Sequence, residues 1–427
     1  MKKSVAIVLV TTMILCLFGG CASAEKPVET TVPEVPQTLS VGFGRADITP
    51  TESVPLDGLG GTKVDRMSKE IDNALHANCI AFTDGAGQTI LMIIVDMVHI
   101  NNYLVQAKSD ISKETGVPFA NIWVGATHNH SAPAMNVEHP AIEAYAKVLR
   151  QKVVQAAKEA LDDRKPAKMH TTEAYPEGLN FVRHYKMSDG SVAGDNFGDF
   201  KNNTIVGHVG NADNQLQIIK FEREGAKDII LGNWQGHPTG HSGSNHNTIL
   251  SCETVFTDKL EAELDCHAAY VLGASGNVNN STRIPEEKVS ANYVDHYQRL
   301  AQYAIDAMAN LKEVEIKGIE FLNQEHSFTT SNGTETRALS LNVASIGGIA
   351  FAAVPYEMFS SSGVYIKENS PYEMTFISTC TNGYSTYMPT KDTFEYGGYE
   401  VRLCKFEPGT AEKVADTYVN MLKELYK

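Results

Sequence analysis

Apolar, β-branched runs alternate along the chain with longer amphipathic stretches, a pattern typical of a layered α/β fold. Residues 89–95 form a continuous apolar run, which predicts a strand buried on both faces. Residues 139–164 carry apolar side chains at helical spacing and predict a long amphipathic helix. Further strands are predicted at 121–126, 215–221, 228–232, 268–272, 348–354 and 374–378, and further helices at 103–114, 253–264, 289–311 and 411–425. We therefore expect a central mixed β-sheet layered with helices.

The N-terminus has the pattern of an export signal. Lys2 and Lys3 precede an apolar run at 5–18 that is too short to span a bilayer as a stable helix. Residues 17–21, Leu-Phe-Gly-Gly-Cys, resemble a bacterial lipobox, in which the thiol of Cys21 is acylated. The Ala-Ser-Ala that follows offers a competing cleavage site. We expect an exported protein that is either a cell-surface lipoprotein, anchored to the membrane through Cys21, or secreted.

The rest of the chain divides into a tether and one large domain. Residues 22–39 are rich in Pro, Thr and Glu and predict a solvated tether. The predicted organisation is therefore a signal peptide with a lipobox at 1–21, the tether at 22–39 and a folded domain at 40–427.

Composition and charge narrow the choice of function. Hydrophobic residues make up 42% of the chain and charged residues 20%, so a sizeable core is expected. A formal net charge of -15, which no basic tract offsets, repels phosphates and argues against nucleic-acid binding. The seven cysteines include no CxxC pair, so cysteine ligation of zinc is not expected. Cys380 and Cys404 are either a disulfide or two buried thiols.

Two histidine-bearing loops follow predicted strands. The strand at 121–126 leads into Thr-His-Asn-His-Ser-Ala-Pro, and residues two apart face the same side of an extended chain. His128 and His130 can therefore converge. The strand at 228–232 leads into Asn-Trp-Gln-Gly-His-Pro, which contains His237. Because strand ends are where open α/β sheets place their sites, we expect a metal site in these loops.

Several motifs, taken in order, resemble those of the neutral/alkaline non-lysosomal ceramidases. They are GFGRADITP at 42–50, THNHSAP at 127–133, NWQGHP at 233–238, GASGNVN at 273–279, VPYE at 354–357, NGYSTY at 382–387 and GGYE at 397–400. The resemblance runs from about residue 41 to residue 400 and corresponds to the N-terminal catalytic domain of that family. It implies a divergent bacterial member.

The resemblance implies a zinc site held by His128, His237, Glu357 and Tyr387. Imidazole, carboxylate and phenol donors suit zinc and leave a position for water. Such an ion lowers the pKa of its water to about 7 and polarises a substrate carbonyl. Without the resemblance, Glu357 would be interpreted as a carboxylate at a helix N-terminus and Tyr387 as a loop aromatic.

The same resemblance implies three catalytic residues. His130 would carry a proton to the leaving amine, Arg183 would bind the carbonyl oxygen, and Tyr399 would stabilise the developing oxyanion. The alternatives are a surface ion pair for Arg183 and a packed turn aromatic for Tyr399. Asp96, at the end of its strand, could either orient a zinc ligand or cap a turn.

The sequence departs from the family at one motif. Sphingolipid-cleaving members carry Gly-Asp-Val-Ser-Pro-Asn, whereas this chain has Asn277 in place of the Asp and Asn279 in place of the Ser. A serine nucleophile is thereby excluded at this position, although a zinc-activated water needs none. Gly398 replaces the Arg of the final family motif, and the C-terminal immunoglobulin-like domain is not expected in this chain. The substrate therefore need not be ceramide itself.

These observations predict a zinc-dependent amidohydrolase that acts on an N-acyl lipid, ceramide-like, or a related N-acyl compound. One alternative keeps the zinc and cleaves an ester or another small acylated molecule. The other is a non-catalytic surface binding protein with a decayed site. The expected partners are thus a small-molecule or lipid substrate and the membrane.

Overall fold

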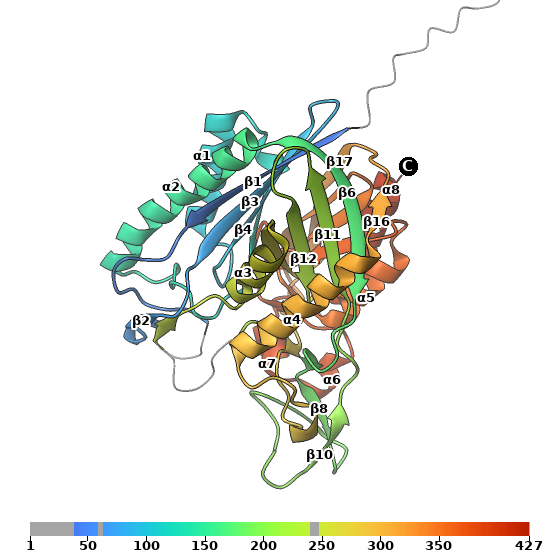
Figure 1. Ribbon diagram of the computed structural model, residues 1–427. Helices are drawn as coiled ribbons and strands as arrows, with labels where there is room; N and C mark the ends of the chain where they lie inside the picture. Colours follow the sequence, from blue (N-terminus) through green and yellow to red (C-terminus); the bar gives the residue numbers. More distant parts are fainter. Residues whose placement is uncertain (1–37, 59–62, 240–246, 427) are drawn as a thin grey trace, which may run out of the picture. The chain divides into compact units, whose positions relative to one another are not determined.

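The computed structural model describes residues 38–58, 63–239 and 247–426, drawn in colour in Figure 1. The predicted signal peptide, the lipobox and nearly all of the tether lie outside these residues. Strand β1 (Leu39–Asp47) already begins at Leu39, the last residue of the predicted tether, and the side chain of Leu39 is buried. Among the described helices, none is both long enough and apolar enough to cross a bilayer.

The main sheet has nine strands and is mixed, as the sequence pattern predicted. Its strands follow the order β14-β12-β11-β6-β1-β3-β4-β5, and β16 pairs with β6. The pairs β4–β5 and β12–β14 are parallel and the other pairs are antiparallel. Besides β1, the strands are β3 (His76–Asp84), β4 (Thr89–Val95), β5 (Ile122–Ala126), β6 (Lys165–Ala174), β11 (Leu216–Arg223), β12 (Ile229–Trp234), β14 (His267–Leu272) and β16 (Lys312–Val314).

Four helices cover one face of this sheet (Figure 1). They are α1 (Asn102–Thr115), α2 (Pro140–Asp162), α3 (Cys252–Leu264) and α4 (Tyr293–Ala307). Local signals set the bounds of α1: the Asn101 side chain accepts hydrogen bonds from the backbone N–H groups of Tyr103 and Leu104, and Gly116 ends the helix at φ 76°. Helix α2 approaches β1 closely because Gly44 has no Cβ; one there would lie 2.1 Å from the carbonyl oxygen of Ala156.

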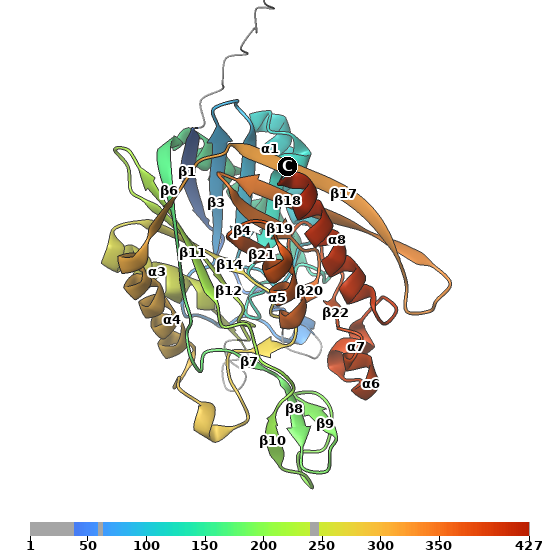
Figure 2. The same ribbon diagram turned by 90° about the vertical axis from the view of Figure 1, so that its right-hand side faces the viewer.

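A second sheet packs on the opposite face of the first. Its order is β17-β18-β19-β21, with strands β17 (Ile319–Thr329), β18 (Thr336–Ile346), β19 (Ile349–Ala353) and β21 (Thr375–Ser378). A shared apolar layer joins the two sheets, and Phe43, Phe221 and Phe351 belong to it. Helices α5 (Ser360–Asn369) and α8 (Thr410–Leu425) cover the outer face of the second sheet (Figure 2). The layers are therefore helix, sheet, sheet and helix.

Most of the strongly apolar predicted elements are confirmed. Strand β4 is buried on both faces, since Ile93 packs toward the helices and Ile94 toward the second sheet. The helix predicted at 289–311 is shorter, because Asn292 caps it and it ends at Ala307. Of the strands longer than four residues, five were missed: β1, β3, β6, β17 and β18. In β17 most side chains are at least partly exposed, so its apolar signal is weak.

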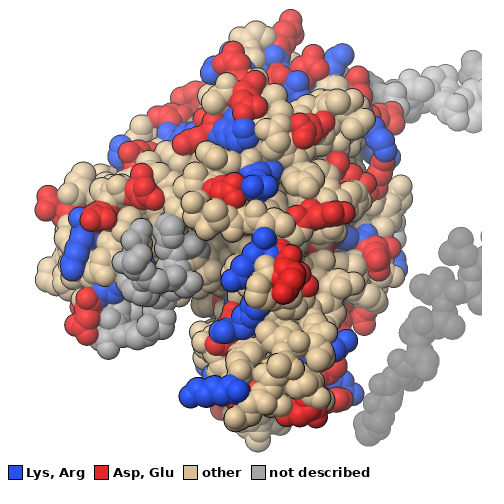
Figure 3. Space-filling model, turned by 60° about the horizontal axis from the view of Figure 1, so that its bottom comes forward, with Lys and Arg blue, Asp and Glu red and all other residues tan. Residues whose placement is uncertain are grey.

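Short elements complete the described fold and surround the strand ends. They are β2 (Glu70–Ile71), β7 (Phe181–Val182), β8 (His184–Met187), β9 (Val192–Gly194), β10 (Ile205–His208), β13 (Thr248–Ile249), β15 (Val278–Asn279), β20 (Glu357–Met358), β22 (Tyr387–Met388), α6 (Thr393–Tyr396) and α7 (Tyr399–Leu403), with 3-10 turns at Lys63–Asp65, Phe119–Asn121, Pro285–Glu287 and Met308–Asn310. Cys380 and Cys404 are both buried free thiols, so they are not a disulfide. On the face drawn in Figure 3, basic side chains lie scattered among acidic ones.

Candidate metal centre

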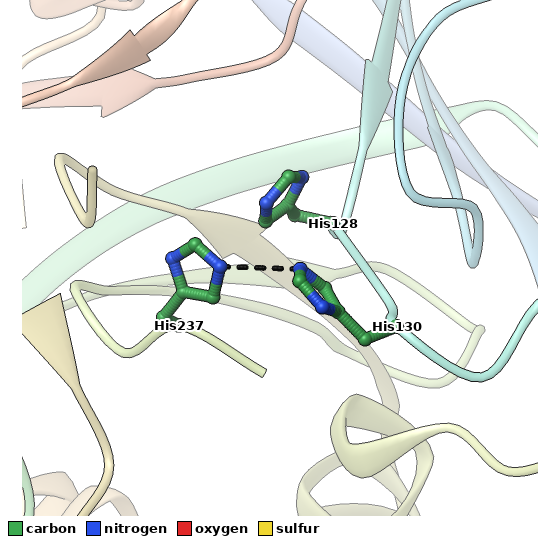
Figure 4. Close-up of side chains that lie close together, drawn as sticks. All are labelled: His128, His130 and His237. Atoms are coloured by element: carbon green, nitrogen blue, oxygen red, sulfur yellow. Dashed lines mark hydrogen bonds between the residues drawn. The ribbon is translucent and has the colours of Figure 1, made fainter. Parts of the chain in front are cut away.

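Three histidines from two distant strand ends converge on one point (Figure 4). His128 and His130 lie in the loop after β5, and His237 lies in the loop after β12. Their ring centroids are 4.7 Å apart for His128 and His130, 4.6 Å for His128 and His237, and 4.9 Å for His130 and His237. The possible ligand atoms of all three lie within 4.8 Å of one another, so this group can hold a metal ion.

These loops come together because one segment of the chain bonds to both edge strands of the main sheet. Although β5 and β14 are its two terminal strands, the segment after β21 reaches both of them. The backbone N–H of Thr379 donates to the carbonyl oxygen of Leu272 at 3.0 Å, and that of Asn382 donates to the carbonyl oxygen of Val124 at 2.8 Å. The carboxyl ends of β5 and β12 therefore face a common site.

His128 is held in one orientation by its own loop. Its backbone has a positive φ of 63°, and its Nδ1 lies 2.6 Å from the carbonyl oxygen of Val98, which leaves Nε2 facing Glu357. Nε2 of His128 and Oε2 of Glu357 are 3.2 Å apart, and the two side chains are only 2% and 3% exposed. These two atoms are not aligned as a hydrogen bond, and neither has another hydrogen-bond partner among the described residues.

A metal ion bound between Nε2 of His128 and Oε2 of Glu357 would give both of these buried atoms a partner. Buried polar atoms nearly always have a hydrogen-bond partner, so two adjacent buried atoms that both lack one need an explanation. A tetrahedral zinc ion with bonds of about 2.0–2.1 Å separates its ligand atoms by about 3.3 Å. The separation of 3.2 Å between Nε2 of His128 and Oε2 of Glu357 matches this value.

Charge in the cluster also fits a cation. Burial lowers the pKa of His130 to about 3, with the charge of His128 adding to the effect, and burial likewise lowers the pKa of His237 well below its usual value. Both imidazoles are therefore neutral, the form that binds metal. Burial alone would lower the pKa of His128, but the Glu357 carboxylate raises it well above the usual range. The site thus favours a positive charge beside Glu357.

Glu357 and Tyr387 lie side by side in a short two-stranded sheet. Strands β20 and β22 are parallel, and Glu357 is the direct partner of Tyr387. The hydroxyl of Tyr384 donates to Oε1 of Glu357 at 2.7 Å, which leaves Oε2 to face His128. Sequence reasoning missed Tyr384, although it stands in the same NGYSTY motif as Tyr387. Tyr387 therefore lies beside Glu357, which in turn faces His128.

Arg183 is buried at this centre and is not on the surface. Its Nε donates to Oε1 of Glu400 at 2.7 Å, its Nη2 donates to the carbonyl oxygen of Gly276 at 2.9 Å, and its guanidinium carbon lies 5.4 Å from the ring centroid of Tyr387. The other carboxylate oxygen of Glu400 lies 3.1 Å from Nε2 of His184. Glu400 and His184 were not predicted, although Glu400 ends the GGYE motif.

The remaining predicted residues take distinct places. Tyr399 begins α7, is half-buried, and its ring centroid lies 5.6 Å from that of Tyr387. Burial raises the pKa of Tyr399, and the Glu357 carboxylate adds to the effect, so its hydroxyl keeps its proton. Among the described residues, the hydrogen-bond partners of Asp96 do not include any of the three histidines. It accepts from the backbone N–H of His76 at 2.8 Å and from the hydroxyl of Thr127 at 3.3 Å, so it braces the turn before His128.

The two asparagines that depart from the family motif are structural. Asn277 accepts a hydrogen bond from the backbone N–H of Ser360 at 2.9 Å through Oδ1, and its carbonyl oxygen accepts from the backbone N–H of Arg183 at 2.9 Å. The amide of Asn279 donates to Asp195. Their contacts position the backbone under Arg183, and neither supplies a nucleophile.

The fold and the site together define a mixed α/β protein with a buried histidine group that can bind a metal ion. Among solved structures, one described as "Ceramidase complexed with C2" matches with a TM-score of 0.74 and 14% identity over 91% of this chain and 75% of that chain. The neutral ceramidase from Pseudomonas aeruginosa matches with a TM-score of 0.71 and 15% identity over 90% of this chain and 74% of that chain. The protein thus has a ceramidase-like fold. No protein-family model and no curated protein matches the chain.

We expect Glu400→Gln to destabilise the protein by about 3 kcal/mol at neutral pH, because it leaves Arg183 buried without its carboxylate. Burial alone would raise the pKa of Glu400, but Arg183 and then His184 lower it from 4.5 to about 2. A lowered pKa contributes stability above the unfolded-state value that is lost as pH falls toward the folded-state value. The difference in free energy of unfolding from wild type should therefore shrink between pH 4.5 and about 2.

Urea unfolding of both proteins across this pH range measures that difference. Glu368→Gln is the matched control, because Glu368 is exposed, and it should change stability by less than about 0.5 kcal/mol. A Glu400→Gln effect that does not change with pH would contradict the assignment of the ion pair.

Proposed function

We propose that this protein is a zinc-dependent hydrolase that cleaves the amide bond of an N-acyl lipid of the ceramide type or of a related N-acyl compound. The observation that carries the proposal is the pair of orphaned atoms on His128 and Glu357 beside two neutral imidazoles. The likeness to ceramidase structures supports the substrate class.

The donor set favours zinc over harder cations. Imidazole nitrogens suit zinc, whereas calcium and magnesium prefer cages of oxygen atoms. His128, His237, Glu357 and Tyr387 would hold the ion. When bound, zinc supplies a water activated for attack at neutral pH and polarises the carbonyl of the substrate.

The side chains around this centre can perform the remaining steps of amide hydrolysis. His130 reaches the centre, since its Nε2 lies 3.1 Å from Nε2 of His237, and it can carry a proton from the attacking water to the leaving amine. The C–O bond forms first and leaves a tetrahedral oxyanion; the C–N bond then breaks as the amine takes up the proton, which yields a carboxylate and an amine. No side-chain nucleophile is needed, which is consistent with Asn279 at the position of the family serine.

Arg183 and Tyr399 provide the electrostatic part of the mechanism. Glu400 and Gly276 hold the guanidinium of Arg183 in one orientation, so its remaining N–H groups can bind the carbonyl oxygen without reorganisation. The protonated hydroxyl of Tyr399 can donate to the oxyanion as negative charge develops there. Arg183 is thus fixed before the substrate binds, which is how such groups lower a barrier most effectively.

Metal analysis tests the proposal most directly. The purified protein should contain about one zinc per chain, and His237→Ala should lose it together with hydrolysis of N-acyl amides. His326→Ala, which alters a histidine on β17 outside the site, should keep both. A chelator should abolish activity and added zinc should restore it. Absence of metal from the wild-type protein would instead favour the binding-protein alternative.

We expect Tyr399→Phe to lower kcat about 10²–10³-fold with little change in KM or zinc content, because it removes one oxyanion donor. The assay compares an N-acyl amide with the ester of the same acyl chain, and faster turnover of the ester would favour the esterase alternative. Tyr365→Phe serves as the control, since Tyr365 is exposed and bonds Asp416 on the outer helix layer. Loss of zinc in Tyr399→Phe would contradict an oxyanion role.

We also propose that the protein is exported and anchored to the membrane through an acylated Cys21, which rests on the lipobox-like segment. Cys21→Ala should move the protein from the membrane fraction to the soluble fraction while leaving hydrolysis unchanged. Metabolic labelling with a fatty acid measures the acylation. Cys16→Ala, which keeps Cys21, is the control. Unchanged fractionation of Cys21→Ala would show that the thiol is not the anchor.

A further inference from the structure

A cavity of about 330 Å³ lies between α1, β5 and the β17–β18 hairpin, apart from the metal centre. None of its lining residues is a candidate metal ligand or catalytic residue. One wall is apolar and consists of Ile100, Leu104, Val105 and Val124, and the rings and methyl groups of Phe119 and Ala120 complete it. Pockets of this size hold small ligands.

The cavity contains the buried ammonium group of Lys108, for which the described part of the chain supplies no counter-ion. Lys108, on α1, is only 9% exposed. Its Nζ lies 4.2 Å from the ring centroid of Phe119 and donates one long hydrogen bond, 3.4 Å, to Oδ1 of Asn382. No carboxylate within residues 38–58, 63–239 and 247–426 forms an ion pair with it. Burial lowers the pKa of Lys108 to about 8, so the group remains mostly charged at neutral pH and at a cost.

Amide groups extend the polar end of the cavity beyond Lys108. The amide of Asn382 donates to Oδ1 of Asn342 at 2.9 Å, and the amide of Asn342 donates to Oδ1 of Asn323 at 2.8 Å. These bonds fix Asn382, whose Oδ1 also accepts from the backbone N–H of Val124 at 3.1 Å. An ammonium group has three donors, and Asn382 uses one of them. Lys108 can therefore donate to a bound anion.

We propose that this cavity binds a monocarboxylate with a short apolar chain. The carboxylate would pair with Lys108, and the chain would lie against Val105 and Phe119, whose apolar side chains are exposed in the lining. Lys108 is the one charged residue in the lining, so the cavity matches an anion of single charge better than a phosphate dianion. Burying the apolar wall under a hydrocarbon chain favours binding. A small inorganic ion has no apolar surface and gives no such contribution.

The cavity adjoins the segment that positions the metal ligands. Asn382 stands two residues before Tyr384, whose hydroxyl holds Glu357. A ligand on Lys108 and Asn382 therefore contacts the same loop that orders the metal centre. The binding inference follows from the cavity alone, and the further point that a short fatty acid released by the enzyme belongs to this ligand class rests on the proposed function.

Calorimetric titration of the purified full-length protein with hexanoate tests the inference without any substrate. Hexanoate should bind at one site, and Lys108→Met should weaken this binding at least about tenfold, because it removes the charge and keeps most of the volume. Val105→Trp should weaken it as much by filling the cavity from its exposed edge while leaving the ammonium intact. Lys113→Met, an exposed position on the same helix, should bind as wild type does.

Each outcome decides the inference. Equal binding by Lys108→Met and wild type would place hexanoate elsewhere, for example on the zinc, and would overturn it. Absence of binding to the wild-type protein would do the same. Inorganic phosphate that binds as tightly as hexanoate, or hexanol that binds equally well, would overturn the carboxylate class. Thermal melting of each variant confirms that it is folded. Since no turnover is measured, failure here is distinct from failure of the proposed hydrolase activity.

Discussion

The candidate site depends on the backbone segment that closes the gap between the two ends of the main sheet. Thr379 bonds to Leu272 of β14, and Asn382 bonds to Val124 of β5, so strands at opposite ends of the order are tied to one short stretch of chain. The loops after β5 and β12 then face each other, which brings His128 and His237 together. The same segment continues to Tyr384 and Tyr387 at the centre.

Some buried charged groups in this protein have their partners within the described chain, and others do not. Arg183 and Glu400 are both buried and form a geometrically complete pair with His184, so their desolvation is offset within the protein. His128 and Glu357 are equally buried, yet two of their atoms lack partners, which is the condition that a bound cation resolves. Lys108 is the opposite case, an ammonium to which none of the described residues offers an anion. The same physical argument therefore points to a metal at one place and a carboxylate at another.

The ceramidase-like fold persists at an identity of 14–15% because the layers need only apolar residues of suitable size at alternating positions. The site is more demanding, since each donor must stand at one point. Asn277 and Asn279 show how the frame adapts: their amide and carbonyl groups support Arg183 and Asp195 by hydrogen bonds. Where the ceramidase motif has a serine this chain has Asn279, and Glu357 faces His128.

The sequence by itself determined the mixed α/β class, the buried strands such as β4, and the two histidine loops, because apolar runs and strand ends are local properties of the chain. The resemblance supplied Glu357, Tyr387, Arg183 and Tyr399. Only the tertiary structure showed that Tyr384 holds Glu357, that Glu400 and His184 hold Arg183, and that Lys108 is buried without a carboxylate partner. The sequence also did not predict strands β6 and β17, since strands whose side chains are largely exposed carry little apolar pattern. These features depend on contacts between residues far apart in the chain, and no local pattern encodes which distant segments meet.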